Sequence, residues 1–310
     1  MIYALGAFDG FHLGHRELLR EARRISEEKG CGWGVMTFEG HPRMFLAKDG
    51  FRLLFNSREK DLIASALGVP VMKRIKFTSE IAALAPDEFV KYAVQNYSAS
   101  GFVIGENFRF GRGRSGDAAM MTEICKMYGL RSSVVKRYVL DGITVSSTET
   151  RKYVQSGNVD MACRMLGYPY IISGVVSHGE GRGTKIGCST ANLDIDSAKV
   201  YPPYGVYAAA AHIDGLWRAV SLNIGANPTF GEGIIPRCEA HIIDYTGDLY
   251  DRHICVFAVK RLRAEEKFSN ADALIARIAK DNAECYAISC DYILRDSKKE
   301  KILNDFAALL

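Results

Sequence analysis

The chain has 310 residues, of which 48% are hydrophobic and 25% charged, and its formal net charge is +4. This mixture is typical of globular proteins and excludes a disordered chain, while the length suits two domains with separate cores. The mild positive charge favours anionic small molecules but is far below the basic footprint of a nucleic-acid-binding protein, so we expect no nucleic-acid partner. No apolar run approaches the roughly 18 residues of a membrane span, so we expect no membrane partner.

Eight cysteines are scattered along the chain without CxxC spacing. The N-terminal MIYALGAF lacks the basic stretch and apolar core of a signal peptide. Together these features favour reduced, mostly buried thiols over disulfides or a zinc site. We therefore expect a cytoplasmic protein, and the sequence makes no prediction of its oligomeric state.

The first half of the chain alternates between strand and helix patterns. Strands are predicted at 2–5, 34–38, 102–105 and 133–139, and helices at 14–29, 57–67, 86–96 and 118–128. Strands separated by helices imply right-handed crossovers and a parallel sheet covered on both faces. The expected architecture is an α/β doubly wound parallel sheet that binds nucleotides.

The pattern changes near Gly167, where helices give way to consecutive short strands. These are predicted at 170–177, 205–212, 217–223, 237–245 and 253–260, followed by helices at 270–285 and after Asp291. Asp214 and Gly215 accept the positive φ angles of a tight hairpin turn. We expect a small antiparallel β-barrel domain with a C-terminal helix, and domains at residues 1–166 and 167–310.

A first phosphate-handling motif, GAFDGFHLGH, begins at Gly6 between a predicted strand and helix. Its glycines allow a tight turn, and Gly14 opens the helix N-terminus to an anion. His12 and His15 could donate to phosphate oxygens as negative charge develops in a transition state. The alternatives are two ordinary surface histidines or half of a metal site, although no further ligands stand at suitable spacing.

A second glycine pattern, GxGxxG, runs from Gly111 to Gly116. A dinucleotide-binding site would also need an acidic residue about 20 positions later, where Arg137 stands instead. We expect the arginines around these glycines, Arg109, Arg112 and Arg114, to face phosphate, so a dehydrogenase is disfavoured.

The second half carries GEGRGTKIGCSTAN at residues 179–192. Its glycines and arginine form a donor-rich loop suited to phosphates, but alone it could be an ordinary hairpin. Thr190 and Asn192 supply hard oxygen ligands suited to Mg²⁺ on a nucleotide. Glu239 follows on a predicted strand, where a glutamate is more often a solvated surface residue. No GxxxxGK[ST] pattern occurs, which excludes a P-loop kinase.

The first half resembles a known family. GxFDGxHxGH is the signature of the nucleotidyltransferase superfamily, and TFEGHPRMF, VIGENFRFGRGRSGD and VSSTETR resemble the adenylyltransferase module of bacterial bifunctional FAD synthetases. The resemblance implies catalytic roles for His12 and His15, and closure of the SST…R element over the ATP phosphates. Gly40 stands where the family usually has proline. The nucleotide- or flavin-binding residues implied in this domain are Gly6, Phe8, Asp9, Gly14, Asn107, Arg109, Ser147, Thr148 and Arg151.

The second half resembles the riboflavin kinase domain. RGTKIGCSTANL, PYGVYA, NIGANPTF and CEAHIIDY recur in the same order as in that family. The resemblance implies that Thr190 and Asn192 hold metal and phosphate and that Glu239 is the catalytic base. Ser189 replaces the family's proline. The substrate-binding residues implied here are Gly181, Arg182, Gly183, Lys185, Thr190, Asn192 and Arg263.

The resemblance implies two reactions. The C-terminal barrel would convert riboflavin and ATP to FMN and ADP, and the N-terminal domain would convert FMN and ATP to FAD and pyrophosphate, both with Mg²⁺. Two alternatives stay open. One is an enzyme with a single working site, and the other is a flavin-binding protein without turnover.

Overall fold

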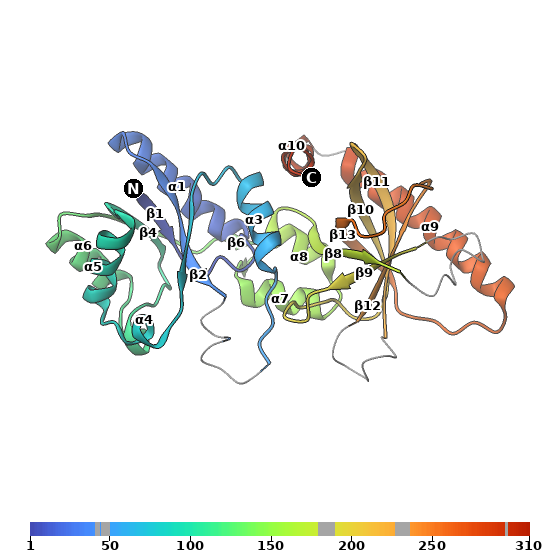
Figure 1. Cartoon of the computed structure of the whole chain (residues 1–310), viewed down its shortest axis with the longest axis horizontal. Coiled ribbons are helices and arrows are strands. Elements are labelled where there is room, and N and C mark those ends of the chain that lie inside the picture. Colours follow the sequence, from blue (N-terminus) through green and yellow to red (C-terminus); the bar gives the residue numbers. More distant parts are fainter. Residues whose placement is uncertain (41–43, 45–49, 179–189, 227–235, 295–296) are drawn as a thin grey trace. The chain divides into compact units, whose positions relative to one another are not determined.

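The computed structural model describes residues 1–40, 44, 50–178, 190–226, 236–294 and 297–310 (Figure 1). The chain forms two compact units. The first consists of Met1–Leu53 and Ile63–Ser147, and the second of Leu54–Leu62 and Thr148–Leu310. The chain therefore leaves the first unit for a short segment and then returns to it.

A five-stranded parallel sheet forms the centre of the first unit, in the order β3-β2-β1-β4-β5. The strands are β1 (Ile2–Leu5), β2 (Trp33–Glu39), β3 (Met72–Lys76), β4 (Gly101–Gly105) and β5 (Arg131–Val135). This order confirms the predicted doubly wound sheet. Because the order reverses between β1 and β4, the crevice beyond their carboxyl ends is where such sheets bind ligands.

The helices of the first unit include all those predicted there, each within one residue of its expected bounds, and two short elements that the sequence did not predict. They are α1 (Leu13–Lys29), α4 (Ser79–Ala83), α5 (Pro86–Tyr97), α6 (Ala118–Met127) and the 3₁₀ turn η1 (Arg112–Arg114), while α3 (Ser57–Ala66) begins in the second unit. Leu18, Leu19, Ala22 and Ile25 are the buried apolar face of α1. Gly30 ends that helix with a φ of 59°, a conformation that glycine adopts without strain.

Some elements differ from the sequence-based expectation. The strand predicted at 133–139 is observed as β5 at Arg131–Val135, and a two-strand hairpin, β6 (Val139–Leu140) with β7 (Ile143–Thr144), follows it. The sequence did not predict β3, because three of its five residues are basic. As the edge strand next to β2 in the described sheet, it tolerates exposed lysines that a central strand would exclude.

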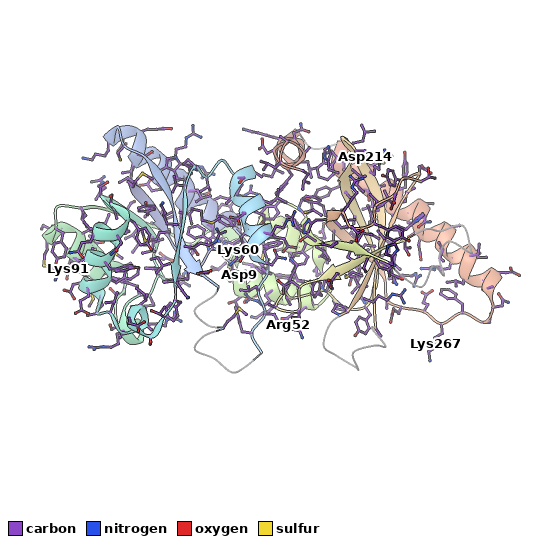
Figure 2. All side chains as sticks on the ribbon, in the orientation of Figure 1. Asp9, Arg52, Lys60, Lys91, Asp214 and Lys267 are labelled. Atoms are coloured by element: carbon purple, nitrogen blue, oxygen red, sulfur yellow. The ribbon has the colours of Figure 1, made fainter. Side chains whose placement is uncertain are left out.

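Six antiparallel strands close into a barrel in the second unit, in the order β10-β11-β12-β9-β8-β13. They are β8 (Tyr170–Ser177), β9 (Ala191–Ile195), β10 (Gly205–Ile213), β11 (Leu216–Gly225), β12 (Arg237–Ile242) and β13 (His253–Arg263). The predicted hairpin is confirmed, because Asp214 (labelled in Figure 2) and Gly215 join β10 to β11 with φ angles of 52° and 77°.

Four helices accompany the barrel: α7 (Ser147–Gln155), α8 (Val159–Leu166), α9 (Ala271–Leu294) and α10 (Ser297–Ala307). Helix α9 is longer than predicted and packs on β10, β11 and β13, where Cys285 joins Val206 and Ala208 in a small core. Phe306 of α10 is fully buried against Tyr168 and Phe257. Among the described residues, no helix is both long and apolar enough to cross a membrane.

Candidate active sites

The loop after β1 holds two bulky residues in an unusual backbone conformation. Phe8 and Phe11 have φ angles of 46° and 38°, and both side chains are fully buried. Positive φ is strained for large side chains and persists only where the surroundings enforce it. The loop is thus held in one shape, as a preorganised binding site requires.

Side-chain hydrogen bonds fix this loop from two directions. The Thr37 hydroxyl of β2 donates to the Ala7 carbonyl at 3.0 Å, and the Ser147 hydroxyl at the start of α7 donates to the Asp9 carbonyl at 2.6 Å. The structure therefore brings together Asp9 and Ser147, two of the predicted site residues. Residues that are 138 positions apart meet at the same loop.

The two histidines of the motif stack on each other. Their ring centroids are 3.7 Å apart, and the His15 backbone N–H donates to His12 Nδ1 at 3.3 Å, so His12 caps α1. Burial lowers the pKa of His12 to about 4. At neutral pH its ring is uncharged, and because Nδ1 accepts a hydrogen bond, the proton lies on Nε2. His12 is therefore an uncharged N–H donor.

Gly6 and Gly14 lie close to aromatic rings of the same loop. A Cβ atom on Gly14 would lie 3.3 Å from the His12 ring, and one on Gly6 would lie 3.3 Å from the Phe8 ring. These distances are tighter than ordinary van der Waals contacts. The N-terminus of α1 also offers backbone N–H groups and the positive end of the helix dipole to an anion.

The remaining predicted residues of the first half are more dispersed. Asn107 and Arg109 are exposed, and Arg109 forms an ion pair with Asp117 at 3.0 Å. The GxGxxG segment forms a turn closed by a bridge between Phe110 and Gly116, and α6 begins only after it. Thr148 and Arg151 lie on α7. Their roles stay predictions.

In the barrel, the pairing of strands β9, β12 and β11 aligns three polar side chains. Glu239 of β12 lies opposite Asn192 of β9 on one side and opposite Asn223 of β11 on the other. Thr190 precedes Asn192 by two residues, so an extended chain places both on the same face. The sequence predicted that Thr190, Asn192 and Glu239 act together. The strand register places Asn192 directly opposite Glu239.

An arginine that the sequence analysis missed joins these side chains. Arg237 Nη2 lies 2.5 Å from Glu239 Oε1 and donates to Asn192 Oδ1 at 3.5 Å. Asn223 Nδ2 donates to Glu239 Oε2 at 3.4 Å. Both carboxylate oxygens of Glu239 are therefore oriented. The two-residue spacing places Arg237 and Glu239 on one face of β12, but such a pair is also common on solvated surfaces, so the sequence carried only a weak signal.

The donor set of this cluster suits Mg²⁺ bound to a nucleotide. Magnesium prefers oxygen ligands and usually takes only one or two from the protein, the others coming from phosphates and water. In this structure Asn192 Oδ1 and the Glu239 carboxylate already face a cation, the Arg237 guanidinium. Among the described residues there is no group of three or more His, Cys, Asp or Glu side chains that would form an all-protein metal site.

Arg263, a predicted substrate-binding residue, is engaged within the second unit. Its Nε and Nη2 atoms donate to Asp281 Oδ2 at 2.9 and 2.6 Å, which ties β13 to α9. A role for Arg263 with nucleotide stays a prediction. The predicted loop residues Gly181, Arg182, Gly183 and Lys185, and the departure at Ser189, lie outside the described residues.

Comparison with known proteins agrees with this division into two sites. Residues 1–149 match the family model for FAD synthetase, and residues 166–289 match that for riboflavin kinase. A bifunctional riboflavin kinase/FMN adenylyltransferase of Bacillus subtilis is 34% identical over 295 residues, which cover 91% of this chain and 90% of the relative. The chain belongs to this bifunctional family.

Further similarities cover nearly the whole chain. The bifunctional riboflavin kinase/FMN adenylyltransferase of Escherichia coli is 34% identical over 285 residues, covering 90% of each chain. A crystal structure described as a macrolide-efflux protein from Streptococcus pneumoniae is 29% identical, with a TM-score of 0.83 over 92% of this chain and 93% of that one. These similarities extend over both units of this chain.

Proposed function

We propose that this chain makes FAD from riboflavin in two ATP-dependent steps, in the cytoplasm. Residues 167–310 would phosphorylate riboflavin to FMN, and residues 1–166 would adenylylate FMN to FAD with release of pyrophosphate. The observation that carries the proposal is the presence of two chemically different sites. One presents the uncharged His12 and the N-terminus of α1 beside a strained loop, and the other presents an oriented carboxylate beside oxygen ligands.

The kinase reaction needs a proton acceptor. The ribityl hydroxyl of riboflavin is neutral at pH 7, so Glu239 would accept its proton as the oxygen attacks the γ-phosphate. Arg237 and Asn223 hold the two carboxylate oxygens in place for this task. Thr190 and Asn192 would hold Mg²⁺, which supplies neutralisation of the phosphate charge when bound.

Adenylyl transfer needs no such base, because the phosphate of FMN is already an anionic nucleophile. The protein's task is to position the reactants and stabilise charge at the α-phosphate of ATP. His12 Nε2–H, His15 and the N-terminus of α1 would supply that stabilisation. An uncharged His12 donates a hydrogen bond without bringing a proton that the reaction would have to remove.

The products formed from riboflavin distinguish this proposal from the alternatives. Purified protein is incubated with riboflavin, ATP and Mg²⁺, and the flavins are separated by chromatography. We expect FAD. If FMN alone accumulates, only the kinase site works, and unchanged riboflavin with no conversion of supplied FMN would indicate a binding protein.

A further inference from the structure

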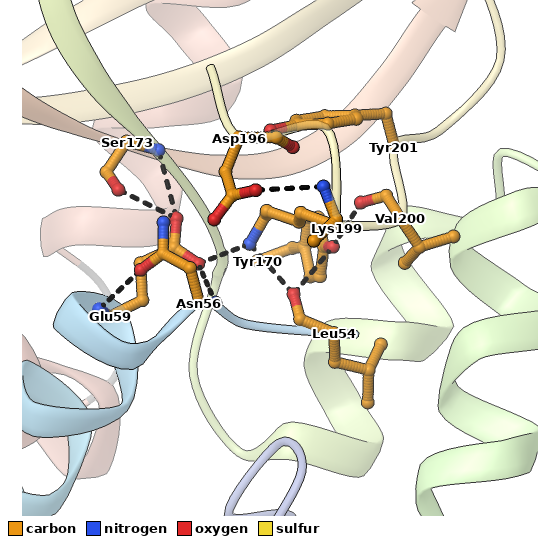
Figure 3. Close-up of polar contacts among 10 residues, drawn as sticks. Leu54, Asn56, Glu59, Tyr170, Ser173, Asp196, Lys199, Val200 and Tyr201 are labelled. Atoms are coloured by element: carbon orange, nitrogen blue, oxygen red, sulfur yellow. Dashed lines mark hydrogen bonds and ion pairs between the residues drawn. The ribbon is translucent and has the colours of Figure 1, made fainter. Parts of the chain in front are cut away.

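A fully buried ion pair joins two distant segments of the second unit (Figure 3). Lys199 Nζ lies 2.6 Å from Glu59 Oε2, and the side chains are 1% and 0% exposed. Lys199 follows β9, whereas Glu59 belongs to the segment Leu54–Leu62, which lies between β2 and β3 in the chain. Burial of both charges is costly unless every polar atom is satisfied.

The Glu59 carboxylate is surrounded by donors. Its Oε1 accepts from the backbone N–H of Ser173 at 3.1 Å and from the Ser173 hydroxyl at 2.8 Å. Its Oε2 accepts from Lys199 and from the Asn56 backbone N–H at 3.1 Å, while Asn56 Oδ1 accepts from the Glu59 N–H at 2.9 Å. This reciprocal pair is a capping box, which fixes the start of α3.

The Lys199 ammonium group is equally well held. It donates to the Leu54 carbonyl at 2.8 Å and lies 4.3 Å from the centre of the Phe55 ring and 4.5 Å from that of Tyr170. The Tyr170 hydroxyl also donates to the Leu54 carbonyl, at 2.9 Å. The aromatic faces replace water around the buried charge.

This cluster is linked to the proposed kinase site through two paired strands. Glu59 binds Ser173 on β8, and Lys199 lies just beyond the end of β9, next to that same end of the β8–β9 ladder. At the other end of the ladder, Ser177 of β8 pairs with Asn192 of β9, which in turn pairs with Glu239. The position of Asn192 therefore depends on how the two strands are anchored.

We propose that Glu59 and Lys199 are positioning residues for the kinase site, and that the segment Leu54–Leu62 anchors strands β8 and β9 within the kinase unit. The segment lies inside residues 1–149, the part of the chain matched by the FAD synthetase model, and outside the riboflavin kinase match. The part of the proposal that concerns activity rests on the proposed function, whereas the structural part does not.

Hydrogen exchange on the full-length protein tests the structural part. Glu59→Gln keeps the size of the side chain but leaves the Lys199 charge buried without its counter-charge, the costly way to break such a pair. We expect amides in residues 170–177 and 190–201 to exchange on the order of 100-fold faster, with β1 and β4 unchanged. The matched control is Glu284→Gln, which removes an exposed partner of Lys280 on α9 and should change nothing. Unchanged protection in 170–177 and 190–201 would overturn the proposal.

Kinetics test the activity part in the same variant. We expect the kinase reaction to lose at least about tenfold in kcat/KM for ATP, chiefly through a raised KM, because the metal and phosphate ligands are misplaced. Conversion of supplied FMN to FAD should be unchanged. Faster exchange with unaltered kinase kinetics would refute the positioning role, and wild-type protein that makes no FMN would refute the proposed function instead.

Milder variants keep the test decisive if Glu59→Gln does not fold. Ser173→Ala removes one of the four hydrogen bonds described above for the Glu59 carboxylate and should speed exchange in 170–177 several-fold. The double variant Glu59→Gln with Lys199→Met removes the stranded charge and should restore part of the lost protection. Wild-type protection from exchange in Ser173→Ala would contradict the proposal that Glu59 and Lys199 together anchor β8 and β9. A double variant no better protected from exchange than Lys199→Met alone would contradict it as well.

Discussion

Asn192 and Glu239 lie directly opposite each other on strands β9 and β12, and the guanidinium of Arg237 contacts both side chains. The barrel thus aligns an amide oxygen suited to a metal with a carboxylate suited to accepting a proton. Because both belong to one rigid pair of strands, substitutions at the two positions should damage the same reaction in different ways.

Asn192→Ala should raise the Mg²⁺ concentration that gives half-maximal kinase activity by about tenfold or more, because it removes a ligand oxygen. The Mg²⁺ dependence of adenylyl transfer should be unchanged. The measurement is a Mg²⁺ titration of each half-reaction at fixed ATP. Asp194→Ala, at an exposed position on the same strand, is the control. An unaltered titration of the kinase would remove Asn192 from the metal site.

Glu239→Gln should reduce FMN formation from riboflavin by at least about 100-fold, since the amide cannot accept the hydroxyl proton. Conversion of supplied FMN to FAD should remain near the wild-type rate. Both rates are followed by chromatography of the flavins, with Glu284→Gln as the control for loss of a glutamate. A variant that still phosphorylates riboflavin at the wild-type rate would show that Glu239 is not the base.

His15→Ala should have the opposite effect. It removes the ring stacked on His12 and a donor at the proposed α-phosphate site, so FAD formation from supplied FMN should fall by about 100-fold. Riboflavin phosphorylation should persist, so that FMN accumulates. His212→Ala on β10 is the matched histidine control. Loss of both activities in a folded His15→Ala protein would disprove the assignment of two separate sites.

The buried His12 should make the first unit less stable in mild acid. Its pKa is lowered from the ordinary 6.5 to about 4, so between these values the unfolded state binds more protons than the folded state. Stability is therefore lost as pH falls from 6.5 towards 4, by about 2 kcal/mol at pH 5 relative to pH 7. His12→Asn keeps a capping side chain but does not titrate, and it should lose this part of the pH dependence.

Tryptophan fluorescence provides the measurement. The chain has two tryptophans, Trp33 on β2 and Trp217 on β11. In a Trp217→Phe background, Trp33 reports urea unfolding of the first unit alone. If the protein that retains His12 and the His12→Asn variant lose the same stability between pH 7 and pH 5, His12 titrates normally in the folded state.

Short-range sequence patterns predicted those helices and turns whose formation depends on neighbouring residues alone. The apolar spacing of α1 with Gly30 at its end, and Asp214-Gly215 in the hairpin, needed no information from elsewhere in the chain. Strand β9 was missed because it begins within the last residues of the glycine-rich motif, which was interpreted as loop up to Asn192. Its pairing with β8 and β12 makes it a strand, and pairing is a long-range property.

The candidate sites show the same contrast. The motif residues Glu239 and Asn192 were identified from the sequence, but their partner Arg237 was not, because a strand arginine two residues from a glutamate is common on solvated surfaces. Nor could the sequence reveal that Glu59 meets Lys199, since the contact spans 140 residues. A buried lysine and glutamate carry no local signature, and only tertiary packing brings them together.

The central claim, that one chain catalyses both steps, is tested most directly by isotope labelling. Purified protein is given riboflavin, Mg²⁺ and ATP labelled at either the γ- or the α-phosphate, and the FAD is isolated and cleaved into FMN and AMP. The account predicts that γ-label appears in the FMN half, because the riboflavin hydroxyl attacks that phosphate, and α-label in the AMP half. The central claim is contradicted if no labelled FAD forms, or if α-labelled ATP gives labelled FAD but γ-labelled ATP does not.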